Sequence, residues 1–306
     1  MSHQYIAVNE ASTVARPRKR LRIGGLIFVL PALLVYSLFV AYPIIHTLLL
    51  STYQWNGIAI HKVFVGLSNF VELFSSDAIF HTTLWNTSRW IIITLLFPVI
   101  LGLILASVLA SNLRGSRFWS SLFFTPAIIP PVAASIAWDL IYHPRVGLLN
   151  QVIRSIGLRN TSTAWLGNSK LALYACVQIG NWIFYGFCML VFLNALQLIN
   201  RDLYEAAEID GANFVQKFFF VTVPMLRNSI TFVVVYSVIS AFKAFEIVFV
   251  LTGGGPYHSS ELISTYMYAT MFNSLRIGYA AAIAAVLALM AFVSAALIIH
   301  IRERNG

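Results

Sequence analysis

The chain has 306 residues, of which 59% are hydrophobic and only 10% are charged. A soluble domain usually carries about 25% charged residues, so this charged minority cannot cover the surface of a globule of this size. The composition therefore excludes a soluble enzyme and a disordered chain, and it indicates an integral membrane protein.

Long runs without Asp, Glu, Lys or Arg predict the membrane spans. Five such runs lie, in chain order, at 23–61, 90–113, 118–138, 171–200 and 277–301. A sixth apolar stretch, 228–251, is interrupted only by Lys243 and Glu246. A helix needs about 20 mostly apolar residues to cross the hydrocarbon core, and the strands of a membrane barrel would alternate in ~10-residue segments. We therefore predict an all-α integral membrane protein with six transmembrane helices.

The segments between the spans give further expectations. The first span is expected at 24–50, and the second is expected to end near Leu113. The third span contains Pro126, Pro130 and Pro131, which favour a kink. The intervening segments 51–83 and 143–170 each contain an amphipathic stretch, and the second of these predicts a short helix over Val146–Ile156. The run Thr252–Pro256 contains three glycines and predicts a sharp turn.

The basic residues predict the orientation. One side of the membrane would carry twelve of them: Arg16, Arg18, Lys19, Arg20, Arg22, Arg114, Arg117, Arg201, Lys217, Arg227, Arg302 and Arg304. The other side would carry six: Lys62, Arg145, Arg154, Arg159, Lys170 and Arg276. Cytoplasmic loops carry the excess, so both termini are expected in the cytoplasm. The placement of the basic residues mainly on one side of the membrane thus accounts for the net charge of +9. We expect contact with membrane lipid and no nucleic-acid partner.

Motifs for catalysis are missing from the sequence. It contains no G-x-x-x-x-G-K-[ST] loop, no H-E-x-x-H and no G-x-S-x-G. The histidines are scattered, and the ionisable residues in or near the spans do not cluster. We expect no catalytic residues, no metal site and no cofactor bound by this chain.

The segment 200–227, expected in the cytoplasm, carries the most informative pattern. Asp202 with Glu205 three residues later predicts a capping box, and Gly211 is well placed to end the helix that follows. By itself this pattern is equally typical of a well-capped connector. However, it also resembles the EAA motif of bacterial ABC importer permeases, which reads E-A-A-x3-G-x9-I-x-L-P. Glu205-Ala206-Ala207, Gly211 and Pro224 match, while Val221 and Val223 replace the Ile and Leu of the motif.

The resemblance covers most of the chain. Ala41–Pro43, Phe64–Phe70, Asn86–Thr87, and Thr252–Pro256 with Tyr266 all look like the carbohydrate-transporting branch of these permeases, and specifically like its first, MalF-like membrane subunit. The chain lacks the extra N-terminal helices and the large periplasmic insertion of the maltose-transporting member, so the roles of those parts do not carry over.

The resemblance implies a type I (MetI-like) permease fold in a bacterial inner membrane. It implies a cytoplasmic tail at 1–23 and a six-helix permease domain at 24–306, with a MetI-like core at about 82–301 and a coupling loop at 200–227. The implied partners are a second permease subunit, two ATPase subunits that hold ATP and Mg, and an extracytoplasmic sugar-binding protein. The ATPase-contacting residues would be Glu205, Ala206, Ala207, Asp210 and Gly211.

Candidate substrate residues lie on two spans. Helical spacing places Tyr236, Ser240 and Lys243 on one face, with Glu246 at its edge; in the fourth span Gln178, Asn181, Trp182 and Tyr185 share a face. Aromatic faces with amide, hydroxyl and charged groups suit a sugar site. The permeases that this chain resembles place sugar contacts in these two helices. Lys243 and Glu246 could instead pair with each other, and Trp182 and Tyr185 could be packing residues. The alternative cargoes are a polyol or a charged sugar derivative. The alternative mechanism is transport without ATP, with Lys243 and Glu246 as a proton relay.

Overall fold

The computed structural model describes residues 23–111, 114–157 and 163–304. The chain divides into two compact units, Met1–His46 and Thr47–Gly306. Apart from Ile23, the predicted tail 1–23 lies outside the described residues.

The first unit is a helix that reaches the border of the second. It consists of α1 (Ile23–Tyr36), a π-helical turn η1 (Ser37–Ala41) and the start of α2 (Tyr42–Leu50), so the predicted first span is helical throughout. Phe28–Leu50 is long and apolar enough to cross a membrane. A helix that is hydrophobic all round belongs in an apolar environment, which is here a bilayer or another protein.

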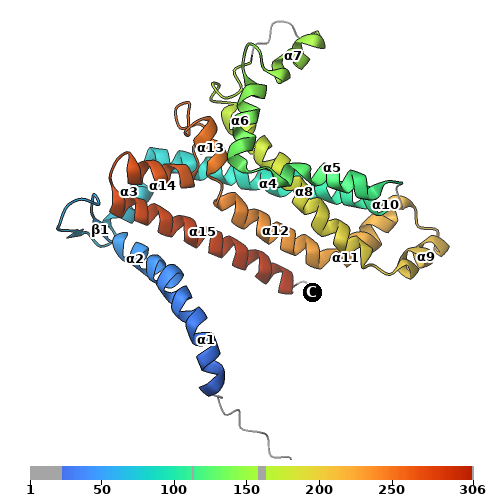
Figure 1. The fold of residues 1–306 in the computed structure, drawn as a ribbon, viewed down its shortest axis with the longest axis horizontal. Coiled ribbons are helices and arrows are strands. Elements are labelled where there is room, and N and C mark those ends of the chain that lie inside the picture. Colours follow the sequence, from blue (N-terminus) through green and yellow to red (C-terminus); the bar gives the residue numbers. More distant parts are fainter. Residues whose placement is uncertain (1–22, 112–113, 158–162, 305–306) are drawn as a thin grey trace, which may run out of the picture. The chain divides into compact units, whose positions relative to one another are not determined.

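The second unit supplies the remaining spans (Figure 1). Those long enough to cross a membrane are α4 (Ala78–Ala110), α8 (Ala172–Gln197), α12 (Arg227–Phe242) with α13 (Glu246–Leu251), and α15 (Ile277–Arg304). A further pair, α5 (Ser116–Ile128) and α6 (Pro131–Tyr142), qualifies as one span bent by 95°. The described chain therefore holds five candidate spans, or six with the bent pair, which agrees with the predicted six. Leu113, the predicted end of the second span, lies outside the described residues.

The bend between α5 and α6 confirms the kink that the prolines predict. Ile129 and Pro130 both have extended backbone, with ψ of 124° and 138°. Each precedes a proline, whose ring disfavours the helical conformation of the residue before it. Pro131 then begins α6, where its missing N–H costs nothing.

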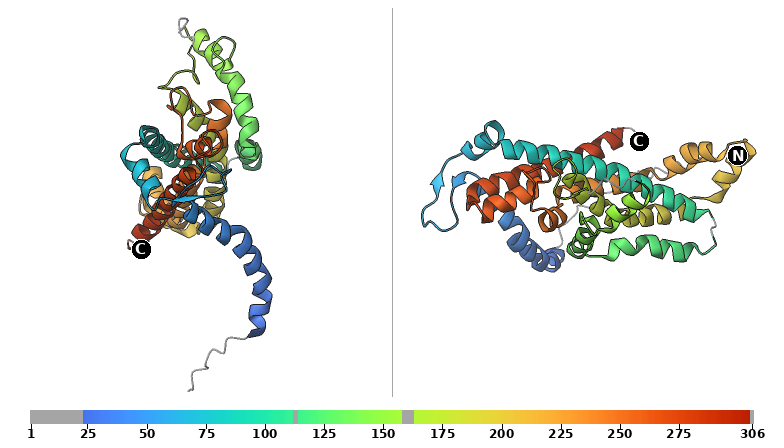
Figure 2. Two further views of the ribbon diagram at one scale, coloured as in Figure 1. Left: turned by 90° about the vertical axis from the view of Figure 1, so that its left-hand side faces the viewer. Right: turned by 90° about the horizontal axis from the view of Figure 1, so that it is seen from above.

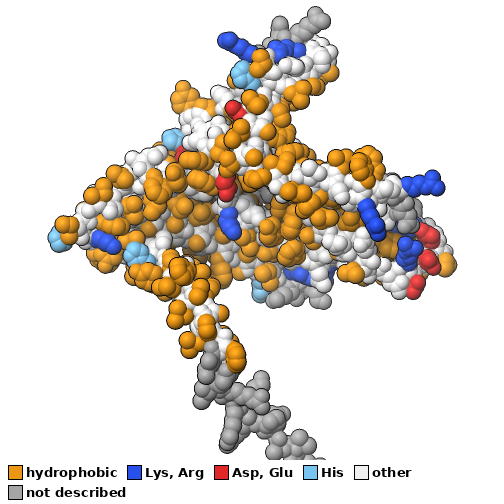
Figure 3. Space-filling model, in the orientation of Figure 1, with side chains coloured by type: hydrophobic (Ala, Val, Ile, Leu, Met, Phe, Trp, Pro, Cys, Tyr) orange, Lys and Arg blue, Asp and Glu red, His pale blue; other side chains and the backbone are white. Residues whose placement is uncertain are grey.

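The core of this unit is the crossing of α4 and α8, which pack together more extensively than any other two elements. One buried cluster joins Val99 and Ala106 of α4 to Met189 and Phe192 of α8 and to Val233 of α12. Figure 2 shows α4 running the length of this unit, with α5 alongside. Figure 3 shows hydrophobic side chains over most of the visible face, as a bilayer requires.

Short elements occupy the two ends of this unit. At one end lie a two-stranded antiparallel hairpin of β1 (Tyr53–Gln54) and β2 (Val63–Phe64), α3 (Ser68–Ser75) and α14 (Ile263–Phe272). At the other end lie α9 (Arg201–Ile209), α10 (Phe214–Lys217), the π turn η2 (Phe218–Thr222) and α11 (Val223–Met225) (Figure 1). The predicted helix over Val146–Ile156 is present as α7 (Leu148–Ser155).

Candidate coupling and substrate sites

Helix α9 carries the EAA-like residues, and its end is formed as the sequence predicts. Gly211 has φ +79°, the left-handed conformation that favours glycine. Its N–H donates to the Glu208 carbonyl at 3.0 Å, and the Ala212 N–H donates to the Ala207 carbonyl at 2.9 Å. These two bonds form a Schellman motif, which satisfies the last carbonyls of the helix.

The beginning of α9 differs from the prediction. The N-cap is Asn200, whose side-chain oxygen accepts from the Asp202 N–H at 3.2 Å. Asp202 therefore lies in the first turn and does not cap the helix, so the predicted capping box is wrong. Asp202 still stabilises this end, because a carboxylate in the first turn interacts favourably with the helix dipole.

Side-chain contacts tie α9 to the chain that follows it. Tyr204 and Thr222 share a hydroxyl–hydroxyl hydrogen bond of 3.0 Å, and Lys217 donates to Glu208 at 2.6 Å. A capping box between Asn213 and Gln216 begins α10 immediately afterwards. These contacts hold α9 on the segment that leads into α12, and the sequence pattern alone did not predict them.

The predicted coupling residues lie at the surface. Glu205, Ala206, Asp210 and Gly211 are exposed, and Ala207 is half-buried. Apart from Gly211 itself and its two chain neighbours, no atom of the described residues lies within 4 Å of the position that a Cβ at Gly211 would occupy. Figure 3 shows charged side chains gathered at this end of the unit. The helix thus offers a small-residue surface to a partner.

The predicted residues of the fourth span do not all face the same surroundings. Gln178 is exposed, and Trp182 and Tyr185 are half-buried on α8, whereas Asn181 is completely buried. Neither the Nδ2 nor the Oδ1 atom of Asn181 has a hydrogen-bond partner among the described residues. Trp182 packs against Trp138 of α6, with ring centroids 5.7 Å apart.

Tyr236 joins the two predicted helices. Its ring lies 4.8 Å from that of Phe187 and 6.0 Å from that of Phe184, both on α8. It also stacks on Phe232 of its own helix at 6.1 Å. The structure therefore packs Tyr236 of α12 against Phe184 and Phe187 of α8, which are not among the predicted substrate residues.

The fifth span is not one continuous helix, which corrects the assumption behind the placement of Glu246. Helix α12 ends at Phe242, Lys243 is its C-cap, and Glu246 begins α13. The Ser264 hydroxyl of α14 donates to the Ala244 carbonyl, which the break leaves without a helical partner. Lys243 and Glu246 are both exposed, and no ion pair joins them in the described structure.

Lys243 lies beside a groove between α12, α14 and α15. The groove has a volume of about 510 Å³, and its lining includes Phe245, Ser264, Tyr268 and Leu287. Most of its lining side chains are apolar. Lys243, Ser264 and the Tyr268 hydroxyl are thus the polar side-chain groups at an otherwise hydrophobic groove. Ser240 is half-buried one turn before Lys243.

A cluster around Asp77 fastens α4, α14 and α15 together at the opposite end from α9. Asp77 caps α4 through the Phe80 N–H at 2.8 Å, and its other oxygen accepts from the Tyr266 and Tyr279 hydroxyls at 2.6 Å each. Burial raises the pKa of Asp77, but the hydrogen bonds from the two tyrosines and the backbone outweigh it and hold the pKa below its usual value. Arg276 lies over the Tyr279 ring at 4.1 Å. The sequence pattern did not predict that Asp77 joins these helices. Its position as a capping residue directly before an apolar run was the one available signal.

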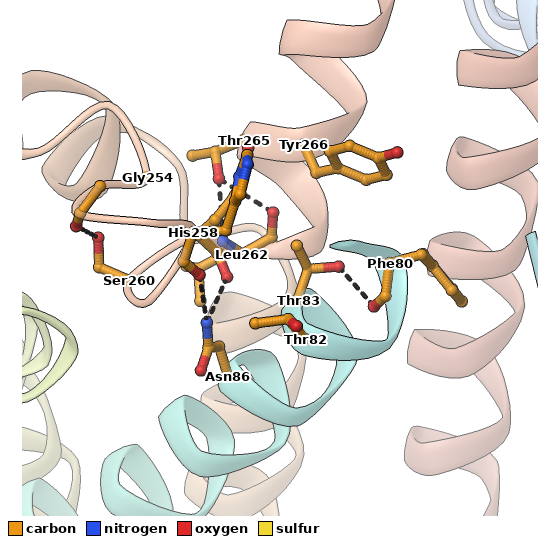
Figure 4. A network of polar contacts seen from close by, with 12 residues as sticks. Phe80, Thr82, Thr83, Asn86, Gly254, His258, Ser260, Leu262, Thr265 and Tyr266 are labelled. Atoms are coloured by element: carbon orange, nitrogen blue, oxygen red, sulfur yellow. Dashed lines mark hydrogen bonds and ion pairs between the residues drawn. The ribbon is translucent and has the colours of Figure 1, made fainter. Parts of the chain in front are cut away.

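The glycine-rich loop turns back onto α4, as Figure 4 shows. The Asn86 amide donates to the carbonyls of His258 and Glu261 at 3.1 and 3.0 Å. Thr87 accepts from the Ile263 N–H at 3.1 Å. Burial raises the pKa of Glu261, although contact with His258 opposes the shift. The Asn86–Thr87 pair of the sequence resemblance therefore anchors the loop that follows the fifth span.

Among the described residues, no group of three or more His, Cys, Asp or Glu side chains could hold a metal ion.

A family model for the inner membrane component of binding-protein-dependent transport systems matches residues 98–304, which is more than half of the chain. The chain belongs to this family. It is accordingly a permease subunit of an ABC importer, a transport component and not an enzyme.

Three curated relatives cover most of the chain. It is 39% identical to the probable ABC transporter permease protein YurN of Bacillus subtilis, over 85% of this chain and 89% of the relative. It is 35% identical to the osmoprotective compounds uptake permease protein GgtC of Synechocystis, over 86% of this chain and 93% of the relative. It is 33% identical to the lactose transport system permease protein LacF of Rhizobium radiobacter, over 88% of this chain and 90% of the relative.

Among solved structures, the fold is similar to a chain of a bacterial alginate ABC transporter in complex with a periplasmic protein that carries an alginate pentasaccharide. The TM-score is 0.81, with 24% identity over 92% of this chain and 95% of that one. This agreement confirms the predicted type I permease fold.

Proposed function

We propose that the chain is the membrane subunit through which an ATP-driven importer moves a sugar or oligosaccharide into a bacterial cell. The observation that carries the proposal is the exposed α9 with its Schellman end at Gly211, on a permease of this family. The sequence resemblance to the carbohydrate branch and the lactose permease among the relatives support the cargo class.

Helix α9 is proposed to enter a cleft of a cytoplasmic ATPase, which binds ATP and Mg. Its exposed Ala206 and half-buried Ala207 permit close approach, and its contacts to Thr222 and Lys217 link it to the start of α12. A rigid-body movement of the ATPase would thereby reach the bundle. A second permease subunit and a second ATPase subunit complete the proposed assembly.

The excess of basic residues in the sequence supports an orientation with α9 and both termini in the cytoplasm. The hairpin and α3 then face outside, because they lie at the opposite end of the unit from α9 (Figure 1). An extracytoplasmic binding protein is proposed to deliver the cargo at that end.

The cargo is proposed to pass along the surface that joins α8 and α12. Tyr185 and Trp182 offer rings for stacking, Gln178 offers an amide, and Lys243 offers donors at the break between α12 and α13. Asn181, Tyr236, Ser240 and Glu246 complete the proposed residue set. The buried amide of Asn181 has no hydrogen-bond partner among the described residues, and such groups ordinarily find one, so it supports a polar partner for this part of α8.

A second candidate cargo is an osmoprotective compound, favoured by the relative that carries this description. Uptake assays separate the candidates. Cells that lack the chain are complemented with it, and uptake is measured for labelled lactose, maltose and trehalose and for a labelled osmoprotective compound that is not a saccharide. We expect saccharide uptake that stops when ATP is depleted. Uptake that instead stops only when the proton gradient is collapsed would contradict ATP-driven import.

A further inference from the structure

A polar pocket lies away from the α8–α12 surface, at the end of the unit that holds the hairpin. It has a volume of about 370 Å³ and is enclosed by the hairpin segment, α3 and the start of α15. Small-molecule sites in proteins occupy about 300–1,000 Å³, so the pocket is large enough for a small ligand. Its lining is rich in groups that form hydrogen bonds, unlike the apolar groove beside Lys243.

The walls of this pocket are fixed by contacts over long sequence distances. The buried Asn69 side chain donates to the carbonyls of Ser51 and Tyr53 at 2.8 and 3.0 Å, which holds the hairpin on α3. The Gly278 N–H donates to the Trp55 carbonyl at 3.2 Å. A side chain at Gly278 would approach the Tyr53 carbonyl oxygen to 1.8 Å, so only glycine allows the hairpin this close to α15. The pocket is therefore preorganised.

The indole of Trp55 is also held in place. Its Nε1–H donates to the Ala59 carbonyl at 2.8 Å, and Lys62 lies over the ring with its Nζ 4.4 Å from the centroid. Lys62 does not line the pocket, whereas Trp55 does. The indole is thus held in a fixed orientation, and a part of its surface that Lys62 does not cover faces the pocket.

Three lining side chains have hydrogen-bonding capacity that the protein does not use. The Gln54 amide, the His61 imidazole and the Ser68 hydroxyl have no hydrogen-bond partner among the described residues. Gln54, His61 and Ser68 are all exposed, so a ligand reaches them without rearrangement of the core.

The charges at the pocket balance. Arg276 donates to both carboxylate oxygens of Glu72, at 2.8 and 2.7 Å, and both side chains line the pocket. A paired Arg and carboxylate leave no net charge to attract an ion, but their outer atoms still donate and accept hydrogen bonds. Neutral, polyhydroxylated ligands suit this set of indole, amide, imidazole, hydroxyl and ion pair better than anions or cations do.

We propose that this pocket is a second saccharide site, which holds one sugar unit at the extracytoplasmic mouth of the permease. The inference rests on the proposed sugar import and on the orientation proposed with it. The site would receive a sugar unit as the binding protein releases its cargo, before that unit reaches the α8–α12 surface.

Thiol labelling in the assembled importer tests the pocket directly. Cys176 and Cys188 are free but buried, so a cysteine introduced as Ser68→Cys would be the reactive thiol among the described positions. The transported saccharide from the uptake assay should slow maleimide labelling of Ser68→Cys severalfold. Ser75→Cys, exposed on the same helix and outside the pocket, is the matched control and should label at an unchanged rate.

A double substitution measures the contribution of the unused polar groups. Gln54→Ala with His61→Ala should raise the saccharide concentration that half-protects Ser68→Cys about tenfold, as expected for the loss of two hydrogen-bonding side chains. Gln197→Ala with His300→Ala removes the same residue types from exposed positions elsewhere and should change nothing.

The outcomes separate this inference from the proposed function. Absence of saccharide uptake by the unmodified importer would overturn the proposed function, and this inference with it. Normal saccharide uptake without protection of Ser68→Cys would overturn the second site alone. Protection by the sugar-free binding protein, with no further effect of the saccharide, would show that the pocket takes a protein side chain and would also overturn the saccharide site.

Discussion

Replacing Gly102 by alanine tests the packing of α4 on α8, on which the other sites depend. An alanine Cβ at this position would lie 2.7 Å from the Cys188 Cβ and 2.8 Å from the Met189 backbone nitrogen. Carbon atoms in contact are ordinarily separated by about 3.5–4.0 Å, so the two helices would have to move apart by about 1 Å.

Two opposing effects decide the sign of the change. Alanine favours an α-helix over glycine by about 1 kcal/mol, which would stabilise Gly102→Ala. Overpacking a well-packed core costs about 1–3 kcal/mol. Because one of the close atoms belongs to the backbone and cannot rotate away, we expect the upper part of that range and a net loss of about 2 kcal/mol.

The assay is the midpoint of thermal unfolding of the purified protein in detergent. Gly180→Ala is the matched control, because it lies in α8 at the same helix pair and gains the same helix propensity. The atoms nearest to its Cβ would all be side-chain atoms, of the Trp90 ring at 3.3 Å and of Ile247 at 3.6 Å, and none would belong to the backbone of another helix. The midpoint should fall for Gly102→Ala and change little for Gly180→Ala. A Gly102→Ala midpoint at or above that of the unmodified protein would refute this description of the helix crossing.

Three further predictions concern the junction, the cargo path and the topology. Asp77→Asn should lower stability at pH 7 by about 1.5–3 kcal/mol, since it weakens hydrogen bonds to a charged acceptor. The pKa of Asp77 is lowered in the folded protein, so its contribution to stability is present above the ordinary carboxyl pKa and is lost as the pH falls through the pKa of the folded state. The unfolding midpoints of Asp77→Asn and the unmodified protein should therefore converge in acid. A constant gap between them would contradict this role of Asp77. Lys243→Ala and Tyr185→Ala should each change sugar preference or apparent affinity in uptake assays while basal ATP hydrolysis and assembly persist; unchanged concentration dependence in both would move the site elsewhere. A reporter active only in the cytoplasm should work when fused after Gly306 and be silent near Asn160, and activity near Asn160 would overturn the orientation.

Local features of the sequence predicted the local structure well. The Schellman end at Gly211 follows from one glycine at the end of a helical pattern, and the bend near Pro130 follows from consecutive prolines. The start of α9 was placed wrongly because Asn200 and Asp202 are both good N-cap residues, and helical propensity does not decide between them.

The sequence pattern did not predict features that depend on contacts between residues far apart in the chain. The apolar run continues through the break after Phe242, where the Ala244 carbonyl is satisfied by Ser264, twenty residues later. The tyrosines that bind Asp77 follow it by 189 and 202 residues, so only the fold brings them together. The burial of Asn181 beside exposed Gln178 likewise depends on how the neighbouring helices pack around α8.

Helix α9 is proposed to transmit ATP-driven movement to the permease, and uptake by α9 variants tests this role most directly. Labelled sugar uptake is measured in cells that carry Ala207→Trp or Gly211→Leu, alongside the amount of each protein in the membrane. Leu198→Trp adds an indole at an exposed position just before α9, and Gly211→Asn adds a side chain that tolerates the left-handed conformation.

We predict that Ala207→Trp and Gly211→Leu insert normally but abolish uptake, whereas Leu198→Trp transports normally and Gly211→Asn retains more uptake than Gly211→Leu. Uptake at the level of the unmodified protein in both Ala207→Trp and Gly211→Leu would contradict the coupling role of this helix.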